Sequence, residues 1–520
     1  MRSSKLSRWL GGSHGILLSL YAFFVLFTFA ILRVSKLQYL PKWFLVTAAI
    51  SAAVCPPLLR RAEKLRLPAP AAGEGKKRGW ALAFFAVPFL CFLVKYLIYY
   101  PGGFTFDSFI QYEQALSGQY NNWHPVIHTL LFFNLPLALT GGWTGSIVLF
   151  QIVWFSLALC YAFSTLRRAA GNRFALFSLA FVLLNPETTN IAVFPWKDAA
   201  FGMGALLLVS FVLKIFCSSG EWLRKPLNLI AFAAVLALTA LVRHNAVLFV
   251  VPLALALFFL APWKRVLALC CCAAVLAVGV NGPLYSALKA EAPGERAVEM
   301  LGLPLAVIGA CAKYAPETLD AETREFVYRL APREVWDDHE TLGDFNTVKW
   351  DPRTDTSVVE SYGAGRVLSM AARCFAGAPL ISLQGLIRLT DVVYTVSDDY
   401  NYCDYPLITD NAYGIETRGV PFLQKAFNTV SGVLNLVLPW LFQYVGAMHF
   451  ALLAVLLAKC RLRRKADRKK ILPVLAVFAY NFGTALLLTG AADSSRFFHY
   501  TFMLTPLLLA LLLRDPGQEA

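Results

Sequence analysis

Residues 80–107 read WALAFFAVPFLCFLVKYLIYYPGGFTFD, an apolar run that stops at one proline and two glycines. A helix needs roughly 20 apolar residues to span a bilayer, and this run is long enough. Pro101, Gly102 and Gly103 end it, and a short stretch with one carboxylate, Asp107, follows. The sequence therefore predicts a spanning helix over 79–99 that brings an acidic residue to the membrane surface.

Similar apolar runs recur along all 520 residues. Hydrophobic residues make up 58% of the chain, charged residues only 15%, and the mean hydropathy is +0.57. A soluble protein has too little interior to bury so much apolar surface. We therefore expect an all-α polytopic membrane protein with about twelve transmembrane helices, each near the required length. The expected spans are 15–33, 43–59, 79–99, 143–164, 174–190, 200–217, 227–243, 246–262, 266–286, 438–458, 471–490 and 498–513.

Basic residues give the orientation and explain the formal net charge of +15. They cluster in short loops beside the spans, as at Arg60, Arg61 and Lys64, which is typical of cytoplasmic loops. We expect a multi-pass protein of the plasma membrane, with both termini cytoplasmic and 100–125 outside. The first span follows basic residues and is expected to be a retained signal anchor. Nucleic acid is not an expected partner, because no basic patch carries interleaved aromatic residues.

The composition divides the chain into three parts. Residues 1–286 form an N-terminal transmembrane module, and 438–520 form a C-terminal one. Between them, 287–437 holds most of the acidic residues and predicts an extracytoplasmic domain of mixed structure. The segment 126–141 is apolar, yet a crossing there would place the basic loop 165–173 outside. We expect it to be re-entrant or interfacial.

The 11 cysteines contain no CxxC pair. Three of them, Cys311, Cys374 and Cys403, fall in the predicted outer domain and allow one disulfide, which the sequence does not assign.

The first outer loop predicts a short amphipathic helix over 104–116. Asp107, Gln111 and Gln114 fall on one face of it. A carboxylate at the membrane surface can act as a general base, and a low local dielectric would raise its pKa. The alternative is that Asp107 only complements the positive end of the helix dipole.

The end of the first outer loop and the other outer turns place polar or charged residues at the same level. They are His124 in the first loop and, in the later turns, Glu187; Lys197 and Asp198; Arg243 and Asn245; and Arg496. Each charge alone could belong to a structural ion pair or be a lysine that reaches the interface. Together they indicate an anion site, and the simplest ligand is a lipid-linked phosphosugar with its phosphate on the cations.

The pattern resembles the GT-C superfamily of membrane glycosyltransferases, which includes protein O-mannosyltransferases and aminoarabinose lipid A transferases. Asp107 matches the acidic residue of their first outer loop, and Glu187 or Asp198 falls where a second acid is found. His124-Pro125 departs from their Lys-Pro-Pro motif, and Arg496-Phe497 stands in place of Arg-Tyr. The chain also resembles a bacterial multi-pass family with a Tyr-Pro-Gly…Asp…Gln…Trp-His-Pro loop.

The resemblance implies a GT-C-like bundle and an inverting transfer of a sugar from a polyprenyl-phosphate donor. Asp107 would be the general base, and Glu187 a second catalytic acid. Substrate-binding residues would be Gln111, His124, Lys197, Asp198, Arg243, Asn245 and Arg496.

Membrane lipids are the other expected partners. The sequence identifies no cofactor with certainty, and a divalent cation is an open alternative, with Asp107 and Glu187 as the pair that could ligate it. Two alternatives remain open: a transporter or flippase of a lipid-linked or anionic solute, and a cell-envelope glycan polymerase.

Overall fold

The computed structural model describes residues 12–67, 79–293, 297–395, 405–461, 464–488, 490 and 495–514. Over these ranges the chain forms helices and no strand, apart from two isolated bridges, Phe104 with Ile408 and Asn121 with Glu291. Eight helices in this part of the chain are long and apolar enough to cross a membrane, which confirms an all-α polytopic membrane protein. They contain α2 (Gly12–Ile31), α3 (Leu40–Lys64), α4 (Gly79–Ile98), α8 (Gly145–Leu184), α10 (Lys197–Cys217), α13 (Trp263–Gly279), α26 (Arg468–Leu487) and α27 (Tyr500–Leu513).

Shorter apolar helices complete the bundle: α11 (Pro226–Leu241), α12 (Val247–Leu257) and α25 (Val445–Lys459). The long α8 covers two predicted spans and is broken at Gly171, whose φ of 83° and ψ of 167° suit glycine alone. The predicted span 174–190 was too long, because α8 ends at Leu184 and a separate α9 (Pro186–Ile191) follows. Asn185 caps α9 by accepting the Thr188 N–H at 2.9 Å.

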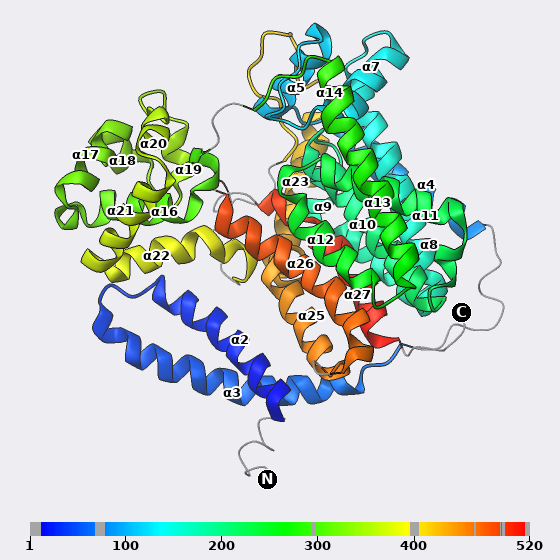
Figure 1. Ribbon diagram of the computed structural model, residues 1–520, viewed down its shortest axis with the longest axis horizontal. Coiled ribbons are helices and arrows are strands. Elements are labelled where there is room, and N and C mark those ends of the chain that lie inside the picture. The colour runs from blue at the N-terminus through cyan, green and yellow to red at the C-terminus, as the bar shows by residue number, and fades with distance from the viewer. Residues whose placement is uncertain are drawn as a thin grey trace.

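One end of the bundle carries α5 (Phe106–Ser117), α7 (Leu135–Thr140) and α14 (Tyr285–Ala287), and we refer to it as the α5 end (Figure 1). The segment Val126–Thr140 is an apolar helix attached at this end. Near its start, the Ile127 N–H donates to the Tyr285 hydroxyl at 3.0 Å, and after it the Trp143 indole donates to the Tyr100 hydroxyl at 3.0 Å. The re-entrant or interfacial placement of this segment stays a prediction.

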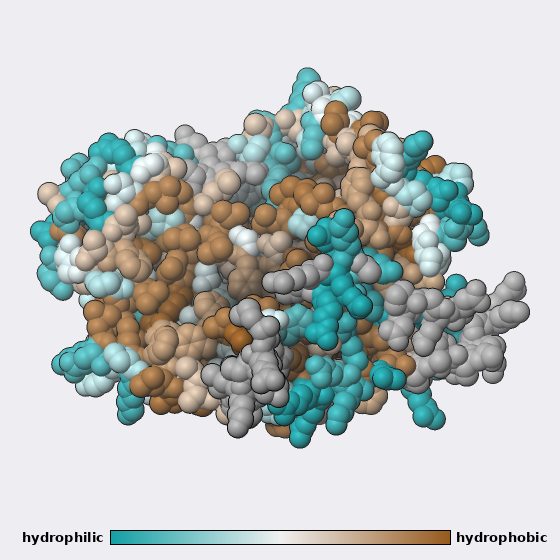
Figure 2. Space-filling view, turned by 60° about the horizontal axis from the view of Figure 1, so that its bottom comes forward, coloured by the Kyte–Doolittle hydropathy of each residue, from teal (hydrophilic) through white to brown (hydrophobic). Residues whose placement is uncertain are grey.

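Basic side chains gather at the opposite end of the bundle. Lys459 donates to the Glu63 carbonyl at 2.8 Å and joins α25 to α3. Lys470 donates to the Leu512 carbonyl at 3.1 Å and joins α26 to α27. In Figure 2, hydrophobic side chains cover the broad middle of the visible face, as a lipid-exposed surface would.

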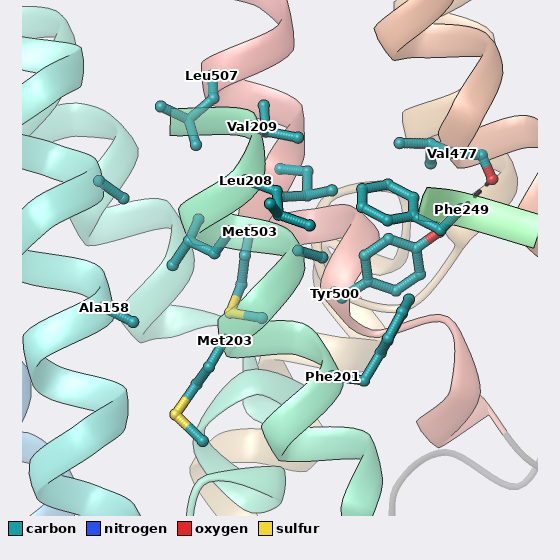
Figure 3. Close-up of a cluster of buried hydrophobic side chains, with 14 of the residues drawn as sticks. Ala158, Phe201, Met203, Leu208, Val209, Phe249, Val477, Tyr500, Met503 and Leu507 are labelled. Atoms are coloured by element: carbon teal, nitrogen blue, oxygen red, sulfur yellow. Dashed lines mark hydrogen bonds between the residues drawn. The ribbon is translucent and has the colours of Figure 1, made fainter. Parts of the chain in front are cut away.

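The core of the bundle lies between α10, α12, α26 and α27 (Figure 3). Phe201 of α10 stacks on Tyr480 of α26 with ring centroids 4.5 Å apart, and Tyr500 of α27 meets both rings edge-on. These residues are almost fully buried. Because the aromatic core fixes where α10 and α27 begin, it also fixes the charged residues at their first turns.

Residues 298–378 form a helical unit with its own apolar core around Trp336. The unit stands beside the bundle in Figure 1. The sequence predicted a mixed domain over 287–437. The described part of this segment combines helices with a stretch without helix, 405–420, and this stretch returns to the bundle: the Phe104 N–H donates to the Leu407 carbonyl at 2.9 Å. The helices of the unit are α15 (Ala297–Met300), α16 (Gly302–Tyr314), α17 (Ala321–Leu330), α18 (Arg333–His339), α19 (Phe345–Lys349), α20 (Ser357–Tyr362) and α21 (Ala364–Gly377).

Two further helices link this unit to the bundle, α22 (Pro379–Thr390) and α23 (Pro421–Val437), with α24 (Pro439–Phe442) leading into α25. Of the three cysteines considered for a disulfide, Cys311 and Cys374 are buried free thiols. Cys403 lies outside the described residues.

Candidate functional site

An ion pair between Asp107 and Arg496 lies at the α5 end. Asp107 is in the first turn of α5, and Arg496 is in the turn η11 (Ser495–Phe497) that leads into α27. The Arg496 Nη2 donates to Asp107 Oδ2 at 3.1 Å. The Asp107 and Arg496 side chains are 29% and 24% exposed, so a ligand can reach both.

The pKa of Asp107 is shifted in the opposite direction to the one expected from the sequence. Burial acts to raise the pKa of Asp107, but the positive charges of Arg496 and Lys197 outweigh it and hold the pKa below its usual range. The sequence-based expectation of a raised pKa is therefore wrong for this state of the protein. An adjacent cation has more effect on the carboxylate than the low dielectric does.

Lys197, the first residue of α10, faces His124 of the first loop. The Lys197 Nζ lies 3.1 Å from His124 Nδ1. An ammonium group only donates, so Nδ1 accepts and the imidazole proton is on Nε2. Burial, and then the charge of Lys197, lower the pKa of His124 to about 3, so the ring is neutral near pH 7. The charged Lys197 ammonium group therefore contacts the neutral imidazole of His124.

Asp198 and Arg243 form a second ion pair, which is buried. Their side chains are in direct contact and only 2% and 4% exposed. Asn245 fixes the arginine, because its Oδ1 accepts from Arg243 Nε at 2.7 Å and its Nδ2 donates to Thr484 at 2.8 Å. These three residues were predicted to bind substrate. Asp198 and Arg243 are buried and Asn245 is partly buried, and together they tie α10 to η5 (His244–Ala246) and α26. Substrate binding by them stays a prediction.

Aromatic rings hold Arg496 in place. The guanidinium carbon lies 4.7 Å from the Trp196 ring centre, and Trp196 stacks on Phe194 at 4.0 Å. Phe194 in turn packs on Gly103, where an added Cβ would come within 2.2 Å of the ring. The Trp196 indole donates to Thr105 at 2.9 Å, just before α5. Neither Trp196 nor Phe194 was among the predicted site residues, although both precede Lys197 in the Phe-Pro-Trp-Lys stretch.

Gln111 does not face the site as the helical spacing suggested. Its Oε1 accepts from His128 Nδ1 at 2.7 Å and from Thr129 at 3.3 Å, and the side chain is 1% exposed. Gln111 therefore holds α5 against the segment Val126–Thr140.

Glu187 lies on α9, which packs against α8, α23 and α27. Its side chain is 1% exposed. The same turn binds a buried lysine from α4: Lys95 Nζ contacts Asn190 and donates to Thr189 at 3.3 Å. Lys95 was missed because it occurs inside an apolar run. The structure places Glu187 in this second buried polar cluster, so a catalytic role for it remains only a prediction.

A polar network also links three helices inside the bundle. The Asn481 Nδ2 donates to His449 Nε2 and to Thr501, both at 2.8 Å, while the Tyr500 hydroxyl donates to Asn481 Oδ1 at 2.8 Å. The other His449 nitrogen donates to the Val393 carbonyl at 2.9 Å. Such satisfied networks join transmembrane helices, and this one needs no ligand to complete it.

No group of three or more His, Cys, Asp or Glu side chains suited to a metal ion occurs in the part of the chain that the structure describes. Comparisons with protein-family models, curated proteins and solved structures return no match for this chain.

Proposed function

We propose that this protein is a membrane glycosyltransferase of GT-C type, which moves a sugar from a polyprenyl-phosphate donor to a hydroxyl acceptor at the outer face of the membrane. The observation that carries the proposal is the accessible Asp107–Arg496 pair with Lys197 beside it. Three cations (Lys197, Arg243 and Arg496) face two carboxylates (Asp107 and Asp198) at this site, and His124 is neutral. The excess positive charge suits a phosphate.

In the proposed reaction, Asp107 acts on the acceptor and Arg496 acts on the donor phosphate. Asp107 removes the proton of the acceptor hydroxyl, and the oxygen attacks the anomeric carbon of the donor sugar. The bond from that carbon to the phosphate oxygen breaks, and its electron pair stays on the phosphate. Arg496 and Lys197 stabilise the charge that develops there. The products are an inverted glycoside and polyprenyl phosphate.

Donor binding would also activate the base. In the free protein, Arg496 and Lys197 keep Asp107 ionised but weakly basic. A phosphate that binds both cations neutralises them, and the burial of Asp107 then raises its pKa. Asp107 therefore becomes a stronger base only when a donor is present, which limits unproductive proton uptake by the free enzyme.

The acceptor has a suitable place next to Asp107. Phe106, 62% exposed, meets Trp350 of the helical unit edge-on, with ring centroids 6.2 Å apart. Trp350 is 61% exposed. Two exposed aromatic faces beside a carboxylate can bind the apolar face of a sugar ring by CH–π contact. The helical unit would thus contribute to acceptor binding.

The topology that this function needs has about twelve crossings, with α8 counted as two and α11, α12 and α25 spanning despite their shorter length. The α5 end is outside, because the basic loops lie at the other end. A membrane-impermeant thiol reagent should label a cysteine placed at Glu113 from outside, and one placed at Lys225 only after permeabilisation. The reverse pattern would exclude an outer site.

Activity is tested with purified protein in proteoliposomes and a panel of polyprenyl-phosphate sugars. The proposal predicts release of polyprenyl phosphate with at least one donor when an acceptor is supplied. Movement of intact donor across the membrane, without cleavage of the sugar–phosphate bond, would instead show a flippase.

A further inference from the structure

A cavity of about 340 Å³ lies away from the Asp107 site, where the helical unit meets the α2–α3 hairpin. Figure 1 shows α22 lying across the end of this hairpin, far from α5. Elements from three regions of the sequence form the walls: the end of α2, the end of α16 with the turn after α18, and α22. The lining residues are Leu32, Arg33, Tyr314, Thr341, Leu342 and Arg388.

The polar groups of the cavity favour an anion. Arg33 donates from Nη1 to the Phe29 carbonyl at 3.2 Å, and its guanidinium lies 3.6 Å from the centre of the Phe29 ring. Arg388 lies 3.8 Å from the carboxylate of Asp391, which is almost fully buried. Among the described residues that line the cavity, two carry guanidinium groups and none is acidic. The hydroxyls of Tyr314 and Thr341 add neutral donors at the wall.

The cavity sits where the hydrocarbon region must end. Arg33 follows α2 by two residues, and α3 starts again at Leu40, so both apolar helices stop at this level. Next to it the hairpin exposes Tyr39 (45%) and Trp43 (40%), the residue types that mark membrane interfaces, and Leu45 (68%) two residues further along α3.

The wall between the hairpin and α22 is rigid. Gln384 of α22, which is buried, donates from Nε2 to the carbonyls of Ile31 and Val34 at 2.8 and 2.9 Å. These bonds reach carbonyl groups at the end of α2, where the helical ladder stops, and the Ile31 carbonyl also accepts from the Val34 N–H at 3.3 Å. Ile31, Val34, Leu380 and Ile387 pack together behind them. The two arginines are therefore carried by elements that are fixed to one another.

We infer that this cavity binds the headgroup phosphate of an anionic membrane phospholipid, with the acyl chains along the exposed surface of the α2–α3 hairpin. A guanidinium donates to a phosphate through two parallel N–H bonds, and two of them from different helices would enclose the headgroup. The volume is at the small end of the range for ligand pockets, which suits a headgroup rather than a whole lipid. This site is independent of the proposed transferase activity.

The test is lipid retention by delipidated protein in a neutral detergent, measured by native mass spectrometry during titration with phosphatidylglycerol or phosphatidylcholine. Wild-type protein should retain phosphatidylglycerol in preference to phosphatidylcholine. The variant Arg33→Gln/Arg388→Gln should lose retention of phosphatidylglycerol roughly tenfold or more, because two charged contacts are removed. The control Arg329→Gln/Arg333→Gln removes two exposed arginines of the helical unit and should bind as wild type.

Equal retention by the double variant and the control would overturn the inference. Displacement of phosphatidylglycerol by millimolar inorganic phosphate would also overturn it, because the ligand would then be a soluble anion. If the double variant does not fold, Arg33→Lys serves instead. It keeps the charge, loses the two-pronged geometry, and should still weaken binding several-fold.

Discussion

Arg496 donates to the carboxylate of Asp107 across 3.1 Å and so joins η11, the turn before α27, to α5, although the two residues are 389 positions apart in the sequence. Neither side chain is sealed from the surface, whereas those of the Asp198–Arg243 pair are. The Asp107–Arg496 pair can therefore exchange its internal contact for a ligand, while the buried Asp198–Arg243 pair holds the surrounding elements together.

Replacing Asp107 by asparagine should abolish transfer without loss of fold. Asparagine keeps the shape and can still contact Arg496 through its carbonyl oxygen, but it cannot accept a proton at neutral pH. Loss of a general base costs roughly 100- to 10,000-fold in rate. Release of polyprenyl phosphate measures the effect, and Glu113→Gln on the exposed face of α5 is the matched control. Wild-type turnover in Asp107→Asn would remove Asp107 as the base.

His124 should make the protein less stable in mild acid. Burial and Lys197 depress the folded-state pKa of His124 to about 3, below its ordinary value of 6.5. The unfolded chain takes up the proton first, so the stability from a neutral His124 is present above pH 6.5 and falls as the pH drops toward 3. Between pH 6.5 and 5 the loss is about 2 kcal/mol.

The comparison of wild type with His124→Gln tests this, because glutamine cannot be protonated over that range. Thermal unfolding followed at several pH values in detergent should give a flatter profile for the variant. Parallel profiles for the two proteins would contradict a buried, neutral His124.

Gly103→Ala should damage the site through packing alone. The added Cβ would come within 2.2 Å of the Phe194 ring, so Phe194, and with it Trp196 and Arg496, must shift. Overpacking of this kind costs roughly 1–3 kcal/mol. We expect a lower unfolding temperature and reduced transfer. Gly365→Ala, a helical position with open space around it, is the control and should keep or increase stability.

The apolar runs predicted most of the fold, because a spanning helix depends mainly on length and hydropathy. The amphipathic pattern of the first outer loop predicted α5, and the re-entrant or interfacial placement of 126–141 stays a prediction. The apolar runs did not show that α8 continues past the predicted end at residue 164 as far as Gly171. Glycine is tolerated in transmembrane helices, and only the φ of Gly171 reveals the break there.

Pairing within the site was harder to predict. Lys197 and Asp198 are neighbours in sequence, but successive residues on a helix point in different directions. Asp198 therefore meets Arg243, and Lys197 meets His124. The sequence placed Asp107 and Arg496 at the same membrane level. It could not reveal that they touch, and so it predicted a shift of the Asp107 pKa in the wrong direction.

Binding of polyprenyl phosphate by purified protein, followed by native mass spectrometry, tests whether a donor phosphate is held beside Asp107. We expect one bound polyprenyl phosphate, with affinity lowered roughly tenfold or more in Lys197→Gln and in Arg496→Gln, because each removes a charged contact. Lys225→Gln, an exposed lysine at the opposite end of the bundle, should bind as wild type. Equal affinity in all four proteins, or no binding at all, would contradict a donor phosphate held beside Asp107.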